Sequence, residues 1–398
     1  MKSNLNIIVG SKAKDFLNTA KMIPARLSDI KSSSDAPATD PDTFTANRVS
    51  AALHPGLLSL KITKITEHTP DIKSYYFTWT GSQPLAYFNA GQYITLVLKI
   101  GDSLVTRAYS LCTSPGEAKR GIYGITVKRV ENGFVSNYIL DNFKPGDRVD
   151  AYAPEGRFFY EPLRDAGTVI AAAGGSGITP FISMAKALDE KTEDFNLVLL
   201  YGAKNKKELV FKKELDEIAE RNGNFKVVYV LSDNRAKDCE RGFITAELIK
   251  KYTPENEEFS VFACGPAAMY KFLDGEIEKL GIRKKFYRKE MFGAKNCGEG
   301  LDGVTPGLFT LTVKDGDGEK FTVPCRGEET VLVALERAGI AVPARCRSGE
   351  CGFCRSRLVA GSVFIPHEND FRRLSDLRYG YIHPCCCYPL GDIEIKIN

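Results

Sequence analysis

The chain has 398 residues, of which 43% are hydrophobic, and its formal net charge is +4. This length suggests two to three domains. Lysine and arginine are interleaved with aspartate and glutamate, which argues against a nucleic-acid surface, because phosphate binding needs basic residues gathered on one face. No run approaches the roughly 20 apolar residues of a membrane span. The start, MKSNLNIIVG, has only a short apolar patch, so we expect a cytoplasmic protein without a secretory signal.

Cysteine is unusually frequent, with eleven residues, six of which lie between Cys346 and Cys387. A disulfide framework is typical of short secreted chains, and this chain is not short. The crowding therefore indicates metal ligation. Only four histidines are present, so few histidine ligands are available for a zinc or Rieske site.

Residues 1–55 differ in composition from the rest. An amphipathic helix is predicted around Lys14 to Met22, and the stretch SSSDAPATDPDT that follows is typical of a flexible linker. We expect a poorly ordered extension, and a docking arm for a partner is the alternative.

Residues 56–163 show short alternating runs, such as LSLKITKI, QYITLVLKI and YGITVKRV, separated by turn residues. This pattern predicts an antiparallel β-barrel. Over residues 164–293, buried strands such as TVIAAA and FSVFACG each precede a helical stretch, for example FISMAKALDE or ELVFKKELDEIAE, which predicts a parallel α/β sheet. A Gly-rich linker over 294–307 then leads to a last domain over 308–398.

The segment ARCRSGECGFCRSRL places Cys346, Cys351 and Cys354 in a C-x4-C-x2-C array. Four thiolates hold an iron–sulfur cluster, and this spacing is that of plant-type [2Fe–2S] centres. A zinc ribbon would need paired C-x2-C knuckles instead. The small residues Ser348, Gly349 and Gly352 allow backbone N–H groups to approach the cluster sulfurs.

The fourth ligand falls among three consecutive cysteines. GYIHPCCCYPLGDIEI resembles the end of plant-type ferredoxins, and that frame, anchored on Gly380, Tyr381, Pro389 and Asp392, puts Cys385 in the ligand position. Cys386 and Cys387 are interpreted as small buried hydrophobes. The resemblance covers the last ninety or so residues and implies a β-grasp fold, whose opening hairpin and helix fit LTVKDGDGEKFTVPC and ETVLVALERAGI.

Two further motifs are candidates for nucleotide binding. RAYS places Arg107 and Tyr109 on one face of a strand and Ser110 on the other, where an arginine would fork onto a phosphate and an aromatic ring would stack on a flat ring. A surface arginine beside a core tyrosine is the alternative. TVIAAAGGSGITP runs from a strand through glycines into a helix, whose start favours a phosphate, although the third glycine of G-x-G-x-x-G is missing.

Taken in order, these motifs resemble the ferredoxin–NADP reductase superfamily over residues 57–293. The resemblance implies a flavin, FAD with FMN as the alternative, bound by Arg107, stacked on Tyr109 and with Ser110 near its reactive nitrogen. It also implies that Cys264 of ACGP lies beside the nicotinamide, so that Ser110 and Cys264 are the catalytic candidates. The other implied cofactor-binding residues are Thr126, Val127, Lys128, Gly133, Val135, Ser136, Gly174, Gly175, Ser176, Gly177, Thr179, Gly265, Pro266, Glu290 and Phe292.

The coenzyme is expected to be NADH, with NADPH as the alternative. Lys204, Lys206 and Lys207 would suit a 2′-phosphate, and no acidic residue for the ribose hydroxyls is obvious nearby. Reductases of this resemblance that serve oxygenases commonly use NADH.

The resemblance implies an NAD(P)H-dependent oxidoreductase that passes electrons through a flavin to its own [2Fe–2S] cluster, and on to a protein acceptor such as an oxygenase. A terminal diaphorase that reduces small acceptors is the first alternative. The second is a relay subunit of a stable complex, whose closer cysteine spacing the gap between Cys354 and Cys385 does not match.

Overall fold

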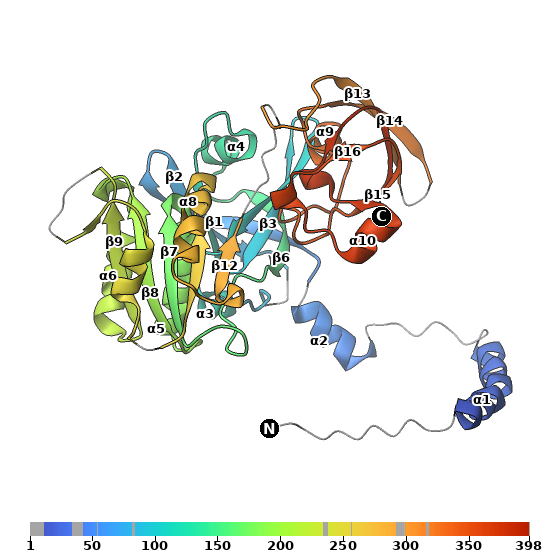
Figure 1. The fold of residues 1–398 in the computed structure, drawn as a ribbon, viewed down its shortest axis with the longest axis horizontal. Coiled ribbons are helices and arrows are strands. Elements are labelled where there is room, and N and C mark those ends of the chain that lie inside the picture. Colours follow the sequence, from blue (N-terminus) through green and yellow to red (C-terminus); the bar gives the residue numbers. More distant parts are fainter. Residues whose placement is uncertain are drawn as a thin grey trace. The chain divides into compact units, whose positions relative to one another are not determined.

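The computed structural model describes residues 12–33, 43–53, 55–81, 84–233, 238–255, 257–291, 298, 300–315 and 318–397 (Figure 1). The chain divides into two compact units, Met1–Ala51 and Ala52–Asn398. Phe292 and the predicted linker around residues 34–42 lie outside the described residues. None of the helices in the described part of the chain is long and apolar enough to cross a bilayer.

The first unit contains a helix longer than the one predicted. Helix α1 spans Lys12–Ser33 and continues through Pro24, whose ring removes one backbone hydrogen bond. Its apolar side chains, among them Phe16, Ile23 and Leu27, are exposed. A second helix, α2 (Thr45–Leu53), was not predicted.

The first sheet of the second unit is antiparallel, and its strand order is β4-β3-β6-β1-β2-β5. A bridge between Leu111 and Ile125 joins its two outer strands, which closes the predicted barrel. Alternation explains its core, because Leu58, Leu60 and Ile62 of LSLKITKI are buried, up to the register shift between Ile62 and Lys64. The strands are β1 (Leu57–Thr69), β2 (Ile72–Trp79), β3 (Tyr93–Ile100), β4 (Ser103–Ser110), β5 (Tyr123–Lys128) and β6 (Arg148–Glu155), and the helices are α3 (Pro115–Lys119) and α4 (Phe134–Asn142).

The second sheet is parallel, with the order β10-β9-β8-β7-β11-β12. Helices α5 and α6 pack on one face and α7 and α8 on the other, so the sheet is covered on both sides, as its uninterrupted apolar strands predict. The strands are β7 (Thr168–Gly174), β8 (Asn196–Ala203), β9 (Phe225–Leu231), β10 (Glu240–Arg241), β11 (Phe259–Cys264) and β12 (Tyr287–Glu290), and the helices are α5 (Thr179–Asp189), α6 (Lys212–Arg221), α7 (Ala246–Tyr252) and α8 (Ala267–Glu278).

Helix α6 begins later than its sequence suggests. The run ELVFKKELDEIAE was expected to be helical from Glu208, but α6 starts at Lys212. Phe211 has a left-handed backbone conformation, with φ of 61°, and is buried in the core of this domain. Burial of this ring therefore overrides the local helical preference.

The last domain has a five-stranded mixed sheet, with the order β14-β13-β19-β15-β17, and a helix packed against it. This arrangement agrees with the expected β-grasp fold. The strands are β13 (Leu308–Lys314), β14 (Lys320–Arg326), β15 (Ser356–Ala360), β17 (Tyr381–Ile382) and β19 (Ile393–Lys396), a small separate sheet pairs β16 (Val363–Phe364) with β18 (Tyr388–Pro389), and the helices are α9 (Val331–Arg337) and α10 (Leu374–Tyr379).

Candidate active site and iron–sulfur site

The barrel and the parallel sheet meet at a buried hydrogen bond between Ser110 and Glu290. Ser110 ends β4 and Glu290 ends β12, and the serine Oγ donates to Oε2 of the glutamate at 2.9 Å. Burial raises the pKa of Glu290 well above its usual range, and the hydrogen bond from Ser110 opposes this only in part. The carboxyl is therefore held in its neutral form between the two domains.

Cys264 lies next to this junction, because it ends β11 directly opposite Glu290 in the β11–β12 ladder. Burial raises the pKa of its thiol, and the neighbouring Glu290 raises it further. The hydroxyl of Tyr270 accepts from the backbone N–H of Gly265 and donates to the carbonyl of Glu290. The hydrogen bonds of Tyr270 thus join the ends of β11 and β12, and burial favours the uncharged thiol form of Cys264.

The glycine turn lies at the point where the parallel sheet changes direction. Strand β7 continues to β8 on one side and has β11 as its other neighbour, and ligands of such sheets bind outside the carboxyl ends at this crevice. A Cβ on Gly177 would come within 2.1 Å of the carbonyl oxygen of Cys264, so this glycine permits the turn to pack against β11. Ser176 is exposed at the tip, and Thr179 Oγ1 donates to its carbonyl at 2.6 Å.

Pro266 opens helix α8 beside this turn, and no side chain caps that helix. Two helix starts, at the glycine turn and at α8, therefore lie at the same end of the sheet without a side-chain cap. The backbone N–H groups of helix starts bind the phosphates of a dinucleotide.

The RAYS strand places its side chains in different surroundings. Tyr109 packs against the barrel core and is half-buried. Burial lowers the pKa of Arg107 to about 10, and its Nη1 donates to the carbonyl of Thr106 at 2.7 Å. The same Nη1 lies 3.6 Å from Glu336 Oε1 of helix α9 in the last domain. Arg107 is thus a half-buried cation whose charge is compensated in part by the carboxylate of Glu336.

The residues expected on β5 divide by role. Val127 is fully buried in the barrel core, and the Thr126 hydroxyl lies 2.8 Å from that of Ser74, so both side chains serve the fold. Lys128 is exposed, and its Nζ would be 3.6 Å from a Cβ on Gly175. Lys128 therefore joins the barrel edge to the glycine turn.

The start of helix α4 is open to an anion. Gly133 occupies the N-cap position without a side-chain hydrogen bond, and a Cβ there would lie 2.4 Å from Ser136 Oγ. The Ser136 hydroxyl lies 3.3 Å from Asn137 Oδ1, and Val135 is buried in the core. The free N–H groups of this first turn fit a flavin pyrophosphate.

The four predicted cluster cysteines are free thiols gathered in two contacting pairs, Cys346 with Cys351 and Cys354 with Cys385. The hydrogen bond from Cys351 lowers the pKa of Cys346 to about 6 although burial opposes it, and the hydrogen bond from Cys354 lowers that of Cys385. Backbone N–H groups of Ser348 and Cys351 point at Cys346 Sγ, at 3.5 and 3.4 Å. Stabilised thiolates of this kind fit a [2Fe–2S] cluster.

Two pairs suit two irons, each of which takes two thiolates. The other two cysteines of the triplet have different partners. Cys386 Sγ donates to the carbonyls of His383 and Asn369, at 3.4 and 3.5 Å, and Cys387 is fully buried in the core of the last domain. Cys385 is thus the member of the triplet that contacts Cys354.

The cluster loop is joined to the barrel beside Tyr93. This buried tyrosine, on β3, pairs with Ser110 in the β3–β4 ladder and with Glu155 in the β3–β6 ladder, and Glu155 forms an ion pair with Arg345 of the cluster loop. Arg345 strengthens the contact, because its Nη1 donates to Glu155 Oε2 at 2.6 Å and its guanidinium stacks over Tyr152 and Phe353.

Glu336 forms a second contact between the barrel and the last domain. Its carboxylate accepts from Arg347 Nη1 at 2.6 Å and from the backbone N–H of Thr106 at 3.2 Å. Glu336 and Arg347 are 5% and 3% exposed, and Arg347 stands directly after the ligand Cys346 with a left-handed backbone. The cluster loop is therefore tied to the strand that carries Arg107, Tyr109 and Ser110.

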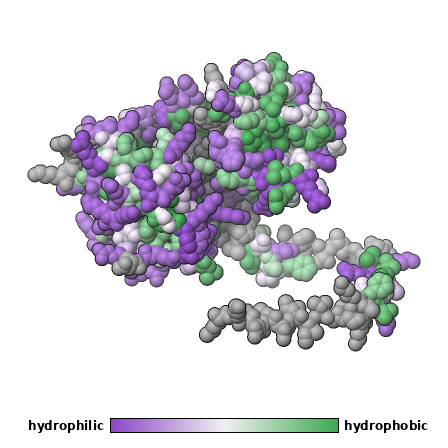
Figure 2. All heavy atoms as spheres, in the orientation of Figure 1, coloured by the Kyte–Doolittle hydropathy of each residue, from purple (hydrophilic) through white to green (hydrophobic). Residues whose placement is uncertain are grey.

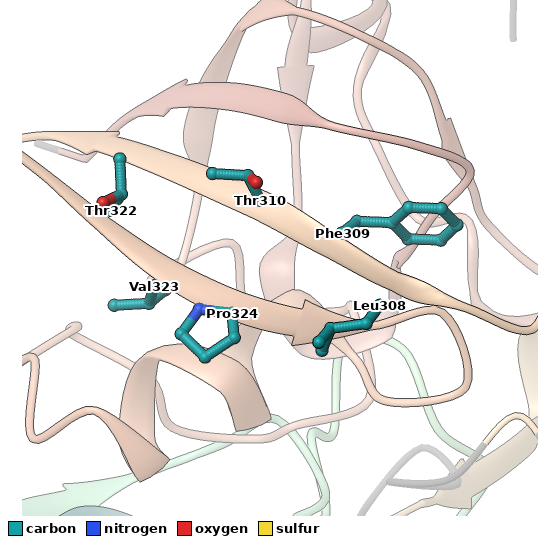
Figure 3. A pocket seen from close by; sticks show the side chains of 6 residues that line it. All are labelled: Leu308, Phe309, Thr310, Thr322, Val323 and Pro324. Atoms are coloured by element: carbon teal, nitrogen blue, oxygen red, sulfur yellow. The ribbon is translucent and has the colours of Figure 1, made fainter.

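Surface hollows do not mark the site. A hollow of about 240 Å³ lies on the β13–β14 hairpin, lined by apolar and hydroxyl side chains such as Leu308, Phe309 and Thr310 (Figure 3). It has no charged or ligating side chain, so it is unsuited to either cofactor.

Comparison with known proteins identifies the family. The family model of the oxidoreductase FAD-binding domain matches residues 59–160, that of the oxidoreductase NAD-binding domain 172–274, and that of the 2Fe-2S iron-sulfur cluster binding domain 315–390. The ferredoxin reductase component of 3-ketosteroid-9-alpha-monooxygenase from Mycolicibacterium smegmatis is 30% identical over 358 residues, which cover 86% of this chain and 97% of that protein. The chain belongs to this family of ferredoxin-type oxygenase reductases.

The similarity of the reductase to other members supports the same assignment. The glycine betaine monooxygenase reductase subunit of Pseudomonas aeruginosa is 28% identical over 84% of this chain and 94% of its own length. The structure of phthalate dioxygenase reductase superimposes with a TM-score of 0.63 at 27% identity, covering 86% of this chain and 98% of that one.

The family assignment confirms the predicted fold class, enzyme class and cofactors. The reductase is an NAD(P)H-dependent oxidoreductase that transfers electrons through FAD to a [2Fe–2S] cluster. The roles of individual residues stay predictions.

Four residues that the structure brings to the site were not predicted: Tyr93, Tyr270, Glu336 and Glu208. Glu208 follows β8 beside the three loop lysines, and its Oε1 accepts from Asn205 at 3.3 Å. The loop after β8 thus carries an acidic side chain beside its lysines. The place of Glu208 directly after Lys207 was visible in the sequence, but the hydrogen bond that holds it was not.

Proposed function

We propose that this reductase oxidises NADH and delivers the electrons singly, through its own cluster, to a separate terminal oxygenase in the cytoplasm. The observation that carries the proposal is the connection from Glu290 through Ser110 and its ladder partner Tyr93 to Glu155, which accepts from Arg345 next to Cys346. It brings the nicotinamide, flavin and cluster residues of three domains into one region.

When bound, FAD accepts a hydride from the nicotinamide, and the [2Fe–2S] cluster takes up and releases one electron at a time. The chain itself supplies binding and orientation. The open starts of α4 and of the glycine turn would bind the phosphates, with Arg107 and Lys128 as countercharges. The Ser110–Glu290 pair orients the two sheets, and Cys346, Cys351, Cys354 and Cys385 would ligate the irons.

Burial favours the neutral forms of Glu290 and Cys264. Neither side chain would then place a fixed negative charge beside the flavin, where such a charge would oppose reduction of the ring. Neither residue needs to act as a general acid or base.

We assign the coenzyme preference to the loop after β8. The Glu208 carboxylate would accept from the ribose hydroxyls and repel a 2′-phosphate, which favours NADH. The lysines oppose this only weakly, since Lys204, Lys206 and Lys207 are all exposed. The domain limits that we propose are 56–163 for the flavin domain, 164–293 for the nicotinamide domain and 308–398 for the ferredoxin domain.

An anaerobic titration with NADH, followed by visible absorption and electron paramagnetic resonance, tests the proposal. We expect loss of the flavin absorption and appearance of a rhombic [2Fe–2S] signal, with NADH acting faster than NADPH. Flavin reduction without a cluster signal, together with rapid turnover of quinones, would show a diaphorase instead.

A further inference from the structure

Helix α10 of the ferredoxin domain carries a cluster of large apolar side chains that no other part of the second unit covers. Phe371 just before the helix is 42% exposed, and Leu374, Leu377 and Tyr379 on the helix are 86%, 49% and 59% exposed. Figure 2 shows apolar surface over the position of α10, next to strongly polar surface. Leu374 and Leu377 are three positions apart and share one side of the helix, with Phe371 just before it, whereas Tyr379 lies on the other side. We call Phe371, Leu374 and Leu377 the α10 face. Contiguous exposed apolar side chains with a polar rim mark an interaction site.

The rim of the α10 face is basic. Within the described residues, no carboxylate lies within 4 Å of the guanidinium groups of Arg357, Arg373 or Arg378, and all three are exposed. Two neighbouring arginines are neutralised, Arg355 by the buried Asp376 and Arg372 by Asp370. Asp370 and Asp376 are therefore already paired. The exposed Glu368 forms no ion pair within the described part of the chain, and it stands against three exposed arginines, so the net unpaired charge on the rim is positive.

The α10 face is directly connected to the cluster loop. The Phe371 ring would lie 3.5 Å from a Cβ on Gly349, which stands between two predicted ligands, Cys346 and Cys351. The carbonyl of Asn369, two residues earlier, accepts from Cys386 Sγ next to a third, Cys385. A protein seated on this face would thus come close to the cluster, as short-range electron transfer requires.

The positive charge around the α10 face indicates which kind of surface can bind to it. Helix α1 of the N-terminal unit also has exposed apolar residues, but its segment KAKDFLNTAKMIPARLSDIKSS has five basic and two acidic residues, so it would be repelled. A second copy of the chain would bring one basic rim against another. An acidic rim around an apolar centre complements the face.

We propose that the α10 face is the surface on which the electron acceptor docks, and that this acceptor is an acidic redox protein with an apolar patch near its own cofactor. This inference rests on the proposed function and adds to it the place and the chemistry of the partner. Arg357, Arg373 and Arg378 attract the acidic acceptor electrostatically as it approaches. Leu374 and Phe371 provide the apolar contact from which water is excluded.

The test compares two protein probes of opposite charge, acidic cytochrome b5 and basic cytochrome c, with the full-length holoprotein. Binding of oxidised cytochrome b5, measured by thermophoresis without NADH, gives a readout that does not depend on turnover. We expect Arg373→Glu/Arg378→Glu to weaken this binding at least about tenfold. The same double variant is expected to bind cytochrome c more tightly, and Leu374→Ser to weaken binding of both probes.

The matched control is Lys284→Glu/Lys285→Glu, which makes the same charge change at exposed positions of the nicotinamide domain. It is expected to leave binding of both probes unchanged. Equal effects of the two double variants would overturn the proposal, because net charge alone would then explain the result. A dimer of the wild-type chain that Leu374→Ser separates into monomers would overturn it as well, since the face would then serve self-association.

Failure of the proposed function is recognised separately in the same samples. NADH-driven appearance of the cluster signal and reduction of ferricyanide should be unchanged in Arg373→Glu/Arg378→Glu. If NADH reduces the cluster normally but the double arginine variant binds the probes as the wild type does, only the assignment of the docking surface is wrong. If NADH leaves the cluster oxidised in the wild-type protein, the proposed function fails and this inference fails with it.

Discussion

Two buried glutamates, Glu290 and Glu336, mark the two junctions of the barrel and differ in how their charge is handled. Glu290 meets a serine hydroxyl at the nicotinamide junction, and burial keeps it neutral. Glu336 meets Arg347 at 2.6 Å and Arg107 at 3.6 Å at the ferredoxin junction, so it is part of a buried ion network.

The difference follows the chemistry on each side. A hydride acceptor is reached through an uncharged junction, whereas a domain that carries anionic thiolates is held by arginines and a compensating carboxylate. The same residue type thus serves one junction as a hydrogen-bonding group and the other as an ion, and its neighbours decide which.

The largest effect is expected from removing the [2Fe–2S] cluster of the ferredoxin domain. Cys385→Ser should abolish the [2Fe–2S] signal, because Cys385 is the fourth thiol and contacts Cys354. Cys386→Ser and Cys387→Ser are the matched controls and should retain the signal. Electron paramagnetic resonance of the reduced variants distinguishes them, and a cluster retained in Cys385→Ser would show that the ligand is misassigned.

The difference between the two junctions is tested by making the same substitution, glutamate to glutamine, at Glu336 and at Glu290. Glu336→Gln leaves two buried guanidinium groups without their anion and should lower the free energy of unfolding by about 3 kcal/mol. Glu290→Gln replaces a neutral carboxyl by a neutral amide that still accepts from Ser110, so it should cost less than about 1 kcal/mol. Denaturant unfolding of the two variants measures both values, and equal costs would remove the distinction.

A third junction carboxyl predicts how stability depends on pH. Burial raises the pKa of Glu193 from 4.5 to about 7, although the backbone N–H of Ala90 opposes this at 3.0 Å. Because the folded pKa is the higher one, the native state binds the proton more tightly. Its stabilising contribution is complete below about pH 4.5 and is lost as the pH rises through 7, on the order of 2 kcal/mol.

Glu193→Gln should remove this part of the pH dependence. Thermal unfolding of the wild type and the variant between pH 5 and pH 8 measures it. The stability of the wild type should fall with rising pH, and that of the variant should fall less steeply. A wild-type stability that rises over this range while the variant follows it in parallel would contradict the assignment.

The smallest expected effect concerns the coenzyme loop, outside both junctions. Glu208→Gln should lower the preference for NADH over NADPH by about tenfold, because the carboxylate would no longer repel the 2′-phosphate. Glu217→Gln on helix α6 removes the same charge from an exposed helix and serves as the control. The ratio of kcat/KM for NADH to that for NADPH measures this preference. An unchanged ratio would show that Glu208 does not determine the coenzyme preference.

The sequence predicted the parts of the molecule that depend on local patterns. Alternation located the barrel strands, uninterrupted apolar runs located the parallel sheet, and the spacing of Cys346, Cys351 and Cys354 identified the cluster type. These signals repeat over two to five residues, which is the scale that periodicity reports.

The residues that join the domains could not be predicted in this way. Glu336 meets Thr106 across 230 positions, and Tyr93 looks like any aromatic residue of a barrel strand until the cluster loop is joined to the barrel beside it. The late start of α6 at Lys212 has a similar cause, since burial of Phe211 outweighs the helical preference of its neighbours. Tertiary packing decides such positions.

The most direct test of the electron path within one chain is a single-turnover reaction with NADH in an anaerobic stopped-flow instrument, with freeze-quenched samples for the cluster signal. We predict that the flavin is reduced first and the cluster second, at a rate that does not change with protein concentration, because the Arg345–Glu155 ion pair and the Glu336 network hold the two domains together. A second phase whose rate increases with protein concentration, or a cluster that stays oxidised, would contradict this path.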